Sequence, residues 1–220
     1  MTTLPLFPLS TVLYPGLVMP LHIFEPRYRT LVAELLAARD EPRTFGIVAI
    51  RHGRETGIDG VDSLYSMGCT AMLRRVSELD EGGYDITVVG GDRFRLLALD
   101  SESRPYLSGA IELVDDETED APAELVQAVT RSFEAYLELI LDRTAEEIVA
   151  ELPDDGLTMS YLVAATMALP LPERQRLLEA PDAVARLRLE RDLLARESSL
   201  VRTLHTLPAT DLTRVGWSPN

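Results

Sequence analysis

Apolar and polar residues follow two different patterns along this chain of 220 residues. As far as about residue 114, the apolar residues come in short runs separated by glycine and proline, which is typical of β-strands. The expected strands are residues 11–14, 17–24, 45–50, 72–79, 84–89 and 94–99. A helix is expected among them at residues 26–38, because Pro26 suits the first helical position and apolar residues then recur at helical spacing. The pattern predicts an all-β lobe with one inserted helix.

Three glycine-containing segments are expected to form turns. Residues 80–83, Asp-Glu-Gly-Gly, separate two strand-like runs of similar length and predict a hairpin. Pro15 and Gly16 suit a tight turn. Gly90 and Gly91 are interpreted as a turn between strands, because no helix follows them that would complete a phosphate-binding loop.

Beyond residue 114 the pattern becomes helical. Residues 115–120 form an acidic run without apolar side chains, so residues 115–122 are the expected linker. Apolar residues then fall on one helix face, at Leu125, Val129, Phe133, Tyr136, Leu137, Ile140 and Leu141. Further helices are expected at residues 158–168, 172–179 and 181–203. The predicted fold class is α+β, with a β lobe at 1–114, the linker at 115–122, a small helical bundle at 123–207 and a tail at 208–220.

The net charge of −15 is spread unevenly. The first 110 residues hold 11 arginines against 14 acidic residues, and the rest hold 10 against 22. Such a surface repels phosphate backbones and anionic lipid, so neither nucleic acid nor a membrane is an expected partner. Prolines interrupt the apolar start of the chain and exclude a spanning helix, and nothing basic precedes Arg27 as a secretory signal would require. We therefore expect a cytoplasmic protein.

The chain contains no lysine, since all 21 basic residues are arginine. A Walker-type nucleotide loop and a Ser–Lys peptidase dyad both need a lysine amine, so both mechanisms are excluded. The three histidines, His22, His52 and His205, and the single cysteine, Cys69, lack the close spacing of paired metal ligands. No metal site and no cofactor are expected. Serine hydrolysis would need a Ser–His–acid cluster drawn from distant segments, and no Gly-x-Ser-x-Gly elbow is present.

A dense motif opens the chain. Residues 4–9 are Leu-Pro-Leu-Phe-Pro-Leu, residues 13–16 are Leu-Tyr-Pro-Gly, and residues 19–28 are Met-Pro-Leu-His-Ile-Phe-Glu-Pro-Arg-Tyr. This motif closely resembles the start of the Lon protease N-terminal domain. Shorter blocks extend the resemblance over residues 3–203, at 45–48, 68–71, 91–96, 105–110, 173–179 and 186–187. The resemblance implies a PUA-like β-barrel lobe followed by a helical bundle, and a role in substrate recognition. We expect a free-standing copy of that domain, without the ATPase and peptidase domains.

The apolar residues beside Pro15 and Gly16 form the candidate polypeptide-binding site: Leu13, Tyr14, Leu17, Val18 and Met19. Exposed apolar patches mark partner sites, and methionine adapts to varied partners. The alternative is that the motif is scaffold. In that interpretation Phe24 and Tyr28 fill the joint between helix and sheet, and Glu25 or Arg27 closes a salt bridge there.

The leading hypothesis is a non-catalytic polypeptide-binding module, either an adaptor for a protease or a holder of unfolded protein. Its expected partners are unfolded or degron-bearing polypeptides and a protease. Two alternatives are an RNA-binding protein, by analogy with other PUA-like folds, and a hydrolase with an unrecognised active site. The sequence carries no signal for the oligomeric state.

Overall fold

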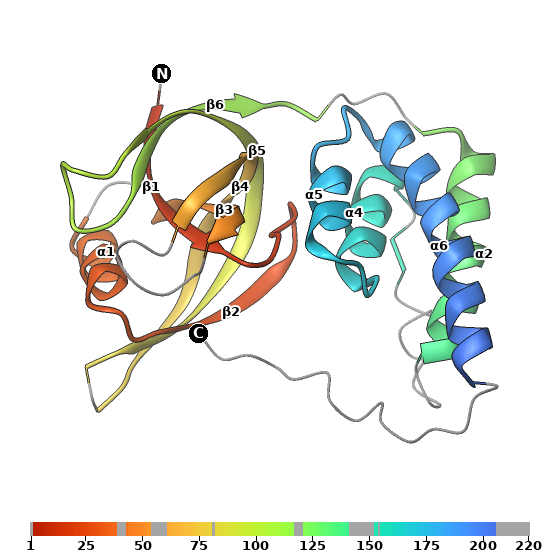
Figure 1. Ribbon diagram of the computed structural model, residues 1–220, viewed down its shortest axis with the longest axis horizontal. Coiled ribbons are helices and arrows are strands. Elements are labelled where there is room, and N and C mark those ends of the chain that lie inside the picture. The colour runs from red at the N-terminus through yellow and green to blue at the C-terminus, as the bar shows by residue number, and fades with distance from the viewer. Residues whose placement is uncertain are drawn as a thin grey trace. The chain divides into compact units, whose positions relative to one another are not determined.

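The computed structural model describes residues 2–38, 43–53, 61–80, 82–116, 121–140, 152–153 and 155–205. Its strands are β1 (Thr2–Leu9), β2 (Val18–Ile23), β3 (Thr44–Gly53), β4 (Val61–Glu78), β5 (Tyr84–Asp100) and β6 (Ser108–Val114) (Figure 1). Its helices are α1 (Pro26–Ala37), α2 (Ala123–Ile140), α4 (Gly156–Thr166), α5 (Leu171–Leu178) and α6 (Ala183–His205). Residues 117–120 of the expected linker, the expected helical position 141 and the expected tail lie outside the described residues.

The elements fall into two compact units. The first unit holds all six strands, α1 and also α5, while the second holds α2, α4 and α6. The chain therefore leaves the second unit after α4, contributes α5 to the first unit and returns to the second unit at α6. The described residues form both strands and helices, so the mixed α+β fold class is confirmed.

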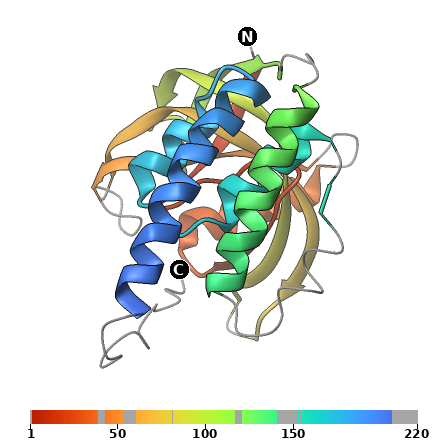
Figure 2. The ribbon, with the colours of Figure 1, turned by 90° about the vertical axis from the view of Figure 1, so that its right-hand side faces the viewer.

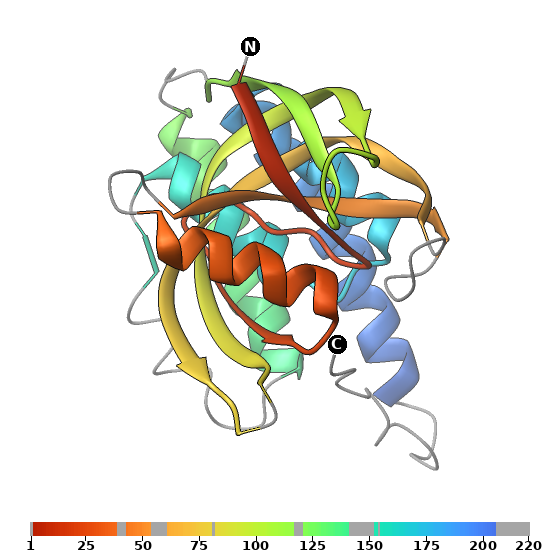
Figure 3. The same ribbon diagram turned by 90° about the vertical axis from the view of Figure 1, so that its left-hand side faces the viewer.

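The strands of the first unit pair in the order β2-β5-β4-β3-β1-β6, and β5 also pairs with β6. Pairing thus forms a closed circuit through β5, β4, β3, β1 and β6, and β2 is added alongside β5. Strands β1 and β3 are parallel, and the remaining pairs are antiparallel. Helix α1 lies across the strands (Figure 3) and buries Tyr28, Leu31 and Val32 in the same core as the strand residues.

Local sequence signals predicted several elements correctly. The hairpin at residues 80–83 is confirmed, because Glu78 of β4 pairs with Tyr84 of β5. The inserted helix is confirmed as α1. Residues 11–14 were expected to be a strand, and that prediction is wrong: they form an irregular segment in which Val12, Leu13 and Tyr14 are nevertheless buried.

The prediction of a turn at Gly90 and Gly91 is also wrong, because both residues lie inside the continuous strand β5. The reason for glycine there is close backbone approach. A Cβ at Gly90 would lie 2.1 Å from the carbonyl oxygen of Tyr14, and a Cβ at Gly91 would lie 2.5 Å from Oγ1 of Thr70. The two glycines therefore allow close approach by Tyr14 and by Thr70 of the neighbouring strand β4, and they do not mark a chain reversal.

Helix α5 docks on the strands of the first unit through polar contacts. The buried guanidinium of Arg93 donates from Nη1 to the carbonyl oxygen of Leu178 at 2.9 Å. Gln175 donates from Nε2 to the carbonyl oxygen of Met67 at 3.0 Å. Because buried polar groups need partners, these bonds fix α5 in one position on the strands. They explain why a helix from the second half of the sequence belongs to the first unit.

In the second unit, α2 and α6 pack side by side (Figure 2). The expected apolar face of α2 is confirmed for Val129, Phe133, Tyr136 and Leu137, which are buried, whereas Ile140 at the end of the helix is 40% exposed. Among the described residues, no helix combines the length and the apolar character needed to cross a bilayer.

A buried polar network joins α6 to α4 in this unit. The guanidinium of Arg186 donates to Oγ of Ser160 at 2.9 Å and to the hydroxyl of Tyr161 at 3.0 Å. The Tyr161 hydroxyl in turn donates to the carboxylate of Asp116 at 2.7 Å. Glu190, one turn after Arg186, is fully buried, and burial raises its pKa well above the ordinary value.

Candidate functional site

The turn that leads into β2 has the geometry that its sequence demands. The amide of Leu17 donates to the carbonyl oxygen of Tyr14 at 3.2 Å, which closes a four-residue turn around Pro15 and Gly16. Gly16 has a φ of 76°, a left-handed conformation that favours glycine and that follows proline in a type II turn. Gly16 also donates to the carbonyl oxygen of Gly90, and Gly90 donates back to that of Leu17, so the turn is fastened to β5 as a glycine bulge.

The structure separates the five predicted site residues. Leu13 and Tyr14 are buried, so the idea that they remain exposed beside the turn does not hold for these two. The Tyr14 hydroxyl donates to the carbonyl oxygen of Arg174 in α5 at 2.8 Å, which gives it a structural role. Leu17 and Met19 are half-buried and pack against the core of the first unit. Only Val18 presents its side chain to solvent, with 64% of its surface exposed.

Alternation along β2 explains this division. Met19, Leu21 and Ile23 point toward the core, whereas Val18, Pro20 and His22 point outward. Phe24, which follows β2, is also outward and 46% exposed. We call the four outward side chains, Val18, Pro20, His22 and Phe24, the edge surface.

Phe24 is the residue that sequence reasoning misplaced. It was expected to fill the joint between helix and sheet together with Tyr28, but only Tyr28 does so, stacked on Phe7 with ring centroids 4.0 Å apart. The two-residue alternation along β2 could have predicted the exposure of Phe24, because an inward side chain at Ile23 requires an outward side chain at Phe24. The expected salt bridge is confirmed, since Arg27 donates from Nε to Oε2 of Glu25 at 3.0 Å.

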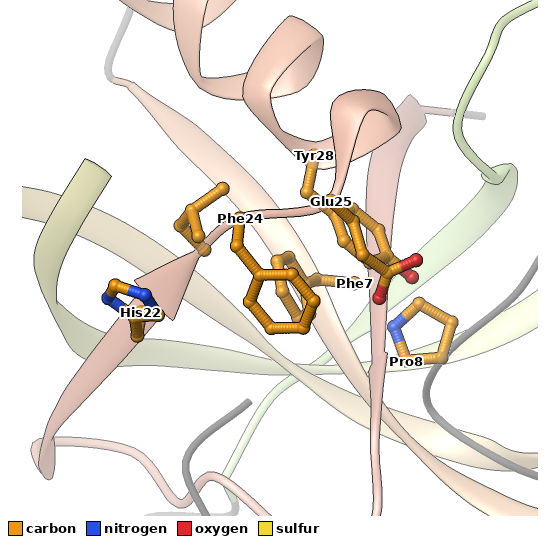
Figure 4. Close-up of a pocket in the computed structure, with 7 residues that line it drawn as sticks. Phe7, Pro8, His22, Phe24, Glu25 and Tyr28 are labelled. Carbon is orange, nitrogen blue, oxygen red and sulfur yellow. The ribbon is translucent and has the colours of Figure 1, made fainter. Parts of the chain in front are cut away.

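A shallow pocket lies at the Phe24 end of the edge surface. It is lined by Phe7, Pro8, His22, Ile23, Phe24, Glu25 and Tyr28. Figure 4 shows the ring of Phe24 at its centre, with His22 on one side and Pro8 on the other. A volume of about 10 Å³ gives room for one water molecule. The site therefore offers a flat surface with an aromatic anchor and not a cavity for a small-molecule cofactor.

One contact between a histidine and a carboxylate lies on this surface. Nδ1 of His22 lies 2.7 Å from Oδ1 of Asp85, its cross-strand partner on β5, and both side chains are exposed. The rings of His22 and Phe24 are stacked with centroids 6.1 Å apart. The contact places the imidazole beside Phe24, at the aromatic end of the edge surface.

One histidine, His52, lies beside a serine. His52 and Ser63 face each other across β3 and β4 with Nδ1 and Oγ 3.0 Å apart, but both lie at the surface, and among the described residues no carboxylate is hydrogen-bonded to the His52 ring. No group of three or more His, Cys, Asp or Glu side chains in the described part of the chain could hold a metal ion.

Solved structures of known proteins share this fold. A Lon N-terminal domain protein from Xanthomonas campestris superposes with a TM-score of 0.64 at 24% identity, covering 89% of this chain and 98% of that one. The N-terminal domain of a Mycobacterium avium complex Lon protease gives the same TM-score at 20% identity, covering 90% and 98%. Both comparisons place the chain in the fold class of Lon N-terminal domains.

Sequence comparison then assigns the family. The chain belongs to the ATP-dependent protease La (LON) substrate-binding domain family, whose model matches residues 3–196. It is 31% identical over 206 residues to Lon protease 2 of Myxococcus xanthus and 32% identical over 205 residues to the Lon protease of Anaeromyxobacter dehalogenans. Each match covers 90% of this chain and 24% of the relative, so the chain spans about a quarter of the length of these curated relatives.

Proposed function

We propose that this protein is a non-catalytic module that binds polypeptide segments, acting as an adaptor or as a holder of unfolded protein. Its substrates are unfolded or degron-bearing polypeptides, and its functional partner is a protease in the cytoplasm. The observation that carries the proposal is the edge surface, an exposed set of side chains including Val18 and Phe24, in a member of a substrate-binding domain family. We further propose that the closed circuit of strands to which β2 is added is a PUA-like β-barrel.

The composition of the site supports binding in preference to chemistry. Val18 and Phe24 leave apolar surface in water, and covering such surface is favourable at roughly 25 cal/mol per Å². The chain has no lysine to serve a Ser–Lys peptidase or a Walker-type ATPase. Of the five residues first proposed for binding, Val18 keeps a direct role, Leu17 and Met19 set its orientation from the core side, and Leu13 and Tyr14 support the turn.

A binding titration with a matched control tests the proposal. The probe is a fluorescently labelled protein that has been reduced and carboxymethylated, so that it stays unfolded. The double variant Val18→Ser with Phe24→Ser should weaken binding about thirtyfold, because each partly exposed side chain contributes on the order of 1 kcal/mol when covered. Its melting temperature should change little, since exposed apolar groups contribute little to folding.

The control is Leu99→Ser with Leu113→Ser, which removes two similarly exposed residues, 50% and 51%, from β5 and β6. This control should bind the unfolded probe as the wild type does. Equal weakening by both double variants would show that any loss of apolar surface has the same effect, and the edge surface would then not be the site.

A further inference from the structure

The backbone of β2 has a second, unused set of hydrogen-bonding groups. The bond from the Gly90 amide to the carbonyl oxygen of Leu17 shows which residues of β2 direct their backbone groups to β5. Backbone groups alternate in direction along a strand, so Met19, Leu21 and Ile23 direct theirs to β5. Val18, Pro20 and His22 direct theirs the opposite way. Among the described strands, β2 pairs with β5 alone.

The position of Pro20 agrees with this alternation of inward and outward backbone groups. Proline has no amide hydrogen, so within a sheet it is tolerated where that hydrogen would face away from the neighbouring strand. The outward edge therefore offers the amide and carbonyl of Val18, the carbonyl of Pro20, and the amide and carbonyl of His22. These groups repeat every two residues, roughly 6.7 Å apart, which is the repeat of an extended chain.

We infer that an extended polypeptide segment binds by pairing as an additional strand along the free edge of β2. This inference rests on the proposed function and specifies its binding mode. An extended backbone matches the alternating donors and acceptors of the edge, whereas a helix has already used its own backbone groups. The neighbouring pocket of about 10 Å³ is also too small to be a groove for a helix.

The edge surface determines which segments fit. Side chains of an added strand that lie on the exposed face stand beside Val18 and Pro20 and approach Phe24, so alternate residues of the segment are apolar. The residues between these apolar positions of the segment face the opposite side of the sheet. The preferred substrate is a segment with the apolar–polar alternation of a half-buried strand, as an unfolded protein exposes.

Pro20 limits the strength of this pairing. Because Pro20 has no amide hydrogen, a segment paired with β2 receives no hydrogen bond from position 20. The hydrogen-bonding edge is thereby divided into two short stretches. Long, flat edge strands invite uncontrolled aggregation, and proline is one of the features that prevent it. Binding by β2 is therefore short-range and reversible, as a module that passes its substrates on requires.

Alternate N-methylation of a peptide tests the inference with the wild-type protein. The probe is a synthetic peptide of alternating valine and serine, measured by fluorescence anisotropy in three forms: unmethylated, N-methylated on every valine, and N-methylated on every serine. Strand pairing predicts that one methylated form binds at least tenfold more weakly while the other binds as the parent does, because only one set of amides faces β2. Loss with methylated valine indicates antiparallel pairing, and loss with methylated serine indicates parallel pairing.

Backbone amides of the protein give an independent readout. In hydrogen exchange, the amides of Val18 and His22 should become protected when the unmethylated peptide is added, while those of Met19 and Leu21 are already protected by β5. Pro20→Val restores the missing amide and should tighten binding about fivefold, as expected for one added hydrogen bond. His22→Pro removes an outward amide and should weaken binding by a similar factor.

The outcomes separate the inference from the proposed function. If neither the alternating peptide nor the carboxymethylated protein binds at all, the proposed function fails. If the peptide binds but both methylated forms bind alike, and Val18 and His22 gain no protection, strand pairing is overturned while polypeptide binding stands.

Discussion

Replacing the buried Glu190 with glutamine should stabilise the second unit at neutral and alkaline pH. Glu190 is 0% exposed, and among the described residues neither of its carboxylate oxygens has a hydrogen-bond partner. It lies four residues after Arg186 on α6, but that guanidinium already bonds to Ser160 and Tyr161. Burial therefore dominates and raises the pKa of Glu190, and the charge of Arg186 offsets only part of the effect.

The sign of the pH dependence follows from the direction of this shift. The folded state holds the Glu190 proton to a higher pH than the unfolded state does, so ionisation favours unfolding. Below about pH 4 both states are protonated and the carboxyl group costs no charge burial. As the pH rises from there through the raised pKa, the free energy of unfolding falls and then levels off. Glutamine keeps the shape without the charge, so Glu190→Gln removes this slope.

The gain near pH 8 comes from removing the buried charge, because the glutamine amide stays without a partner among the described residues; each unit by which burial raises the pKa corresponds to about 1.4 kcal/mol. The assay is urea unfolding followed by far-UV circular dichroism across this pH range, with the variant and the wild type compared at each pH. The difference between them should shrink toward zero on acidification. Glu138→Gln, on an exposed position of α2, is the control and should show no such trend. A Glu190→Gln protein that is less stable at pH 8, or a difference that does not vary with pH, would refute this reasoning.

Three further predictions follow from the packing of the first unit and the path of the chain. Gly90→Ala should destabilise the first unit by several kcal/mol, because its Cβ would lie 2.1 Å from the Tyr14 carbonyl oxygen. Gly16→Ala should cost about 1 kcal/mol through its φ of 76°, because its Cβ has open space. A thermal melt should therefore show the larger loss for Gly90→Ala. Arg93→Met should cost about 2 kcal/mol by leaving the Leu178 carbonyl unpaired, and hydrogen exchange should then speed up in α5 and not in α6. Cleavage within the acidic run 115–120 by a Glu-specific protease should yield two fragments that still co-elute on gel filtration. The reason is that α5 lies on the second fragment but belongs to the strand unit. Separate elution would show that the contacts of α5 are too weak to hold the fragments together.

Elements fixed by neighbouring residues were the ones that could be predicted from the sequence. The hairpin at residues 80–83 and helix α1 depend on turn chemistry and on Pro26, which act locally. The course of β5 through Gly90 depends on Tyr14, which is 76 residues away along the chain, so a local interpretation as a turn failed. The grouping of α5 with the strands depends on Arg93 and Gln175, and no periodicity reports such contacts.

The candidate site could be predicted only in part for the same reason. The exposure of Val18 follows from its place beside a turn, and it was expected. The burial of Leu13 and Tyr14 results from the bulge that fastens the turn to β5 and from the hydrogen bond of Tyr14 to α5, both of which are long-range contacts. The exposure of Phe24 follows from the alternation of β2, but the buried Ile23 and Tyr28 in the same motif favoured an interior position for it.

Site-specific photocrosslinking tests most directly whether polypeptides bind at the edge surface. A photoreactive phenylalanine analogue is introduced singly at Val18, Phe24, Leu99 or Leu113, and each protein is irradiated with the labelled carboxymethylated polypeptide. The account predicts strong crosslinks from positions 18 and 24 and background levels from 99 and 113, which are as exposed but lie elsewhere. Crosslinks of equal yield from all four positions, or yields highest at 99 and 113, would contradict it.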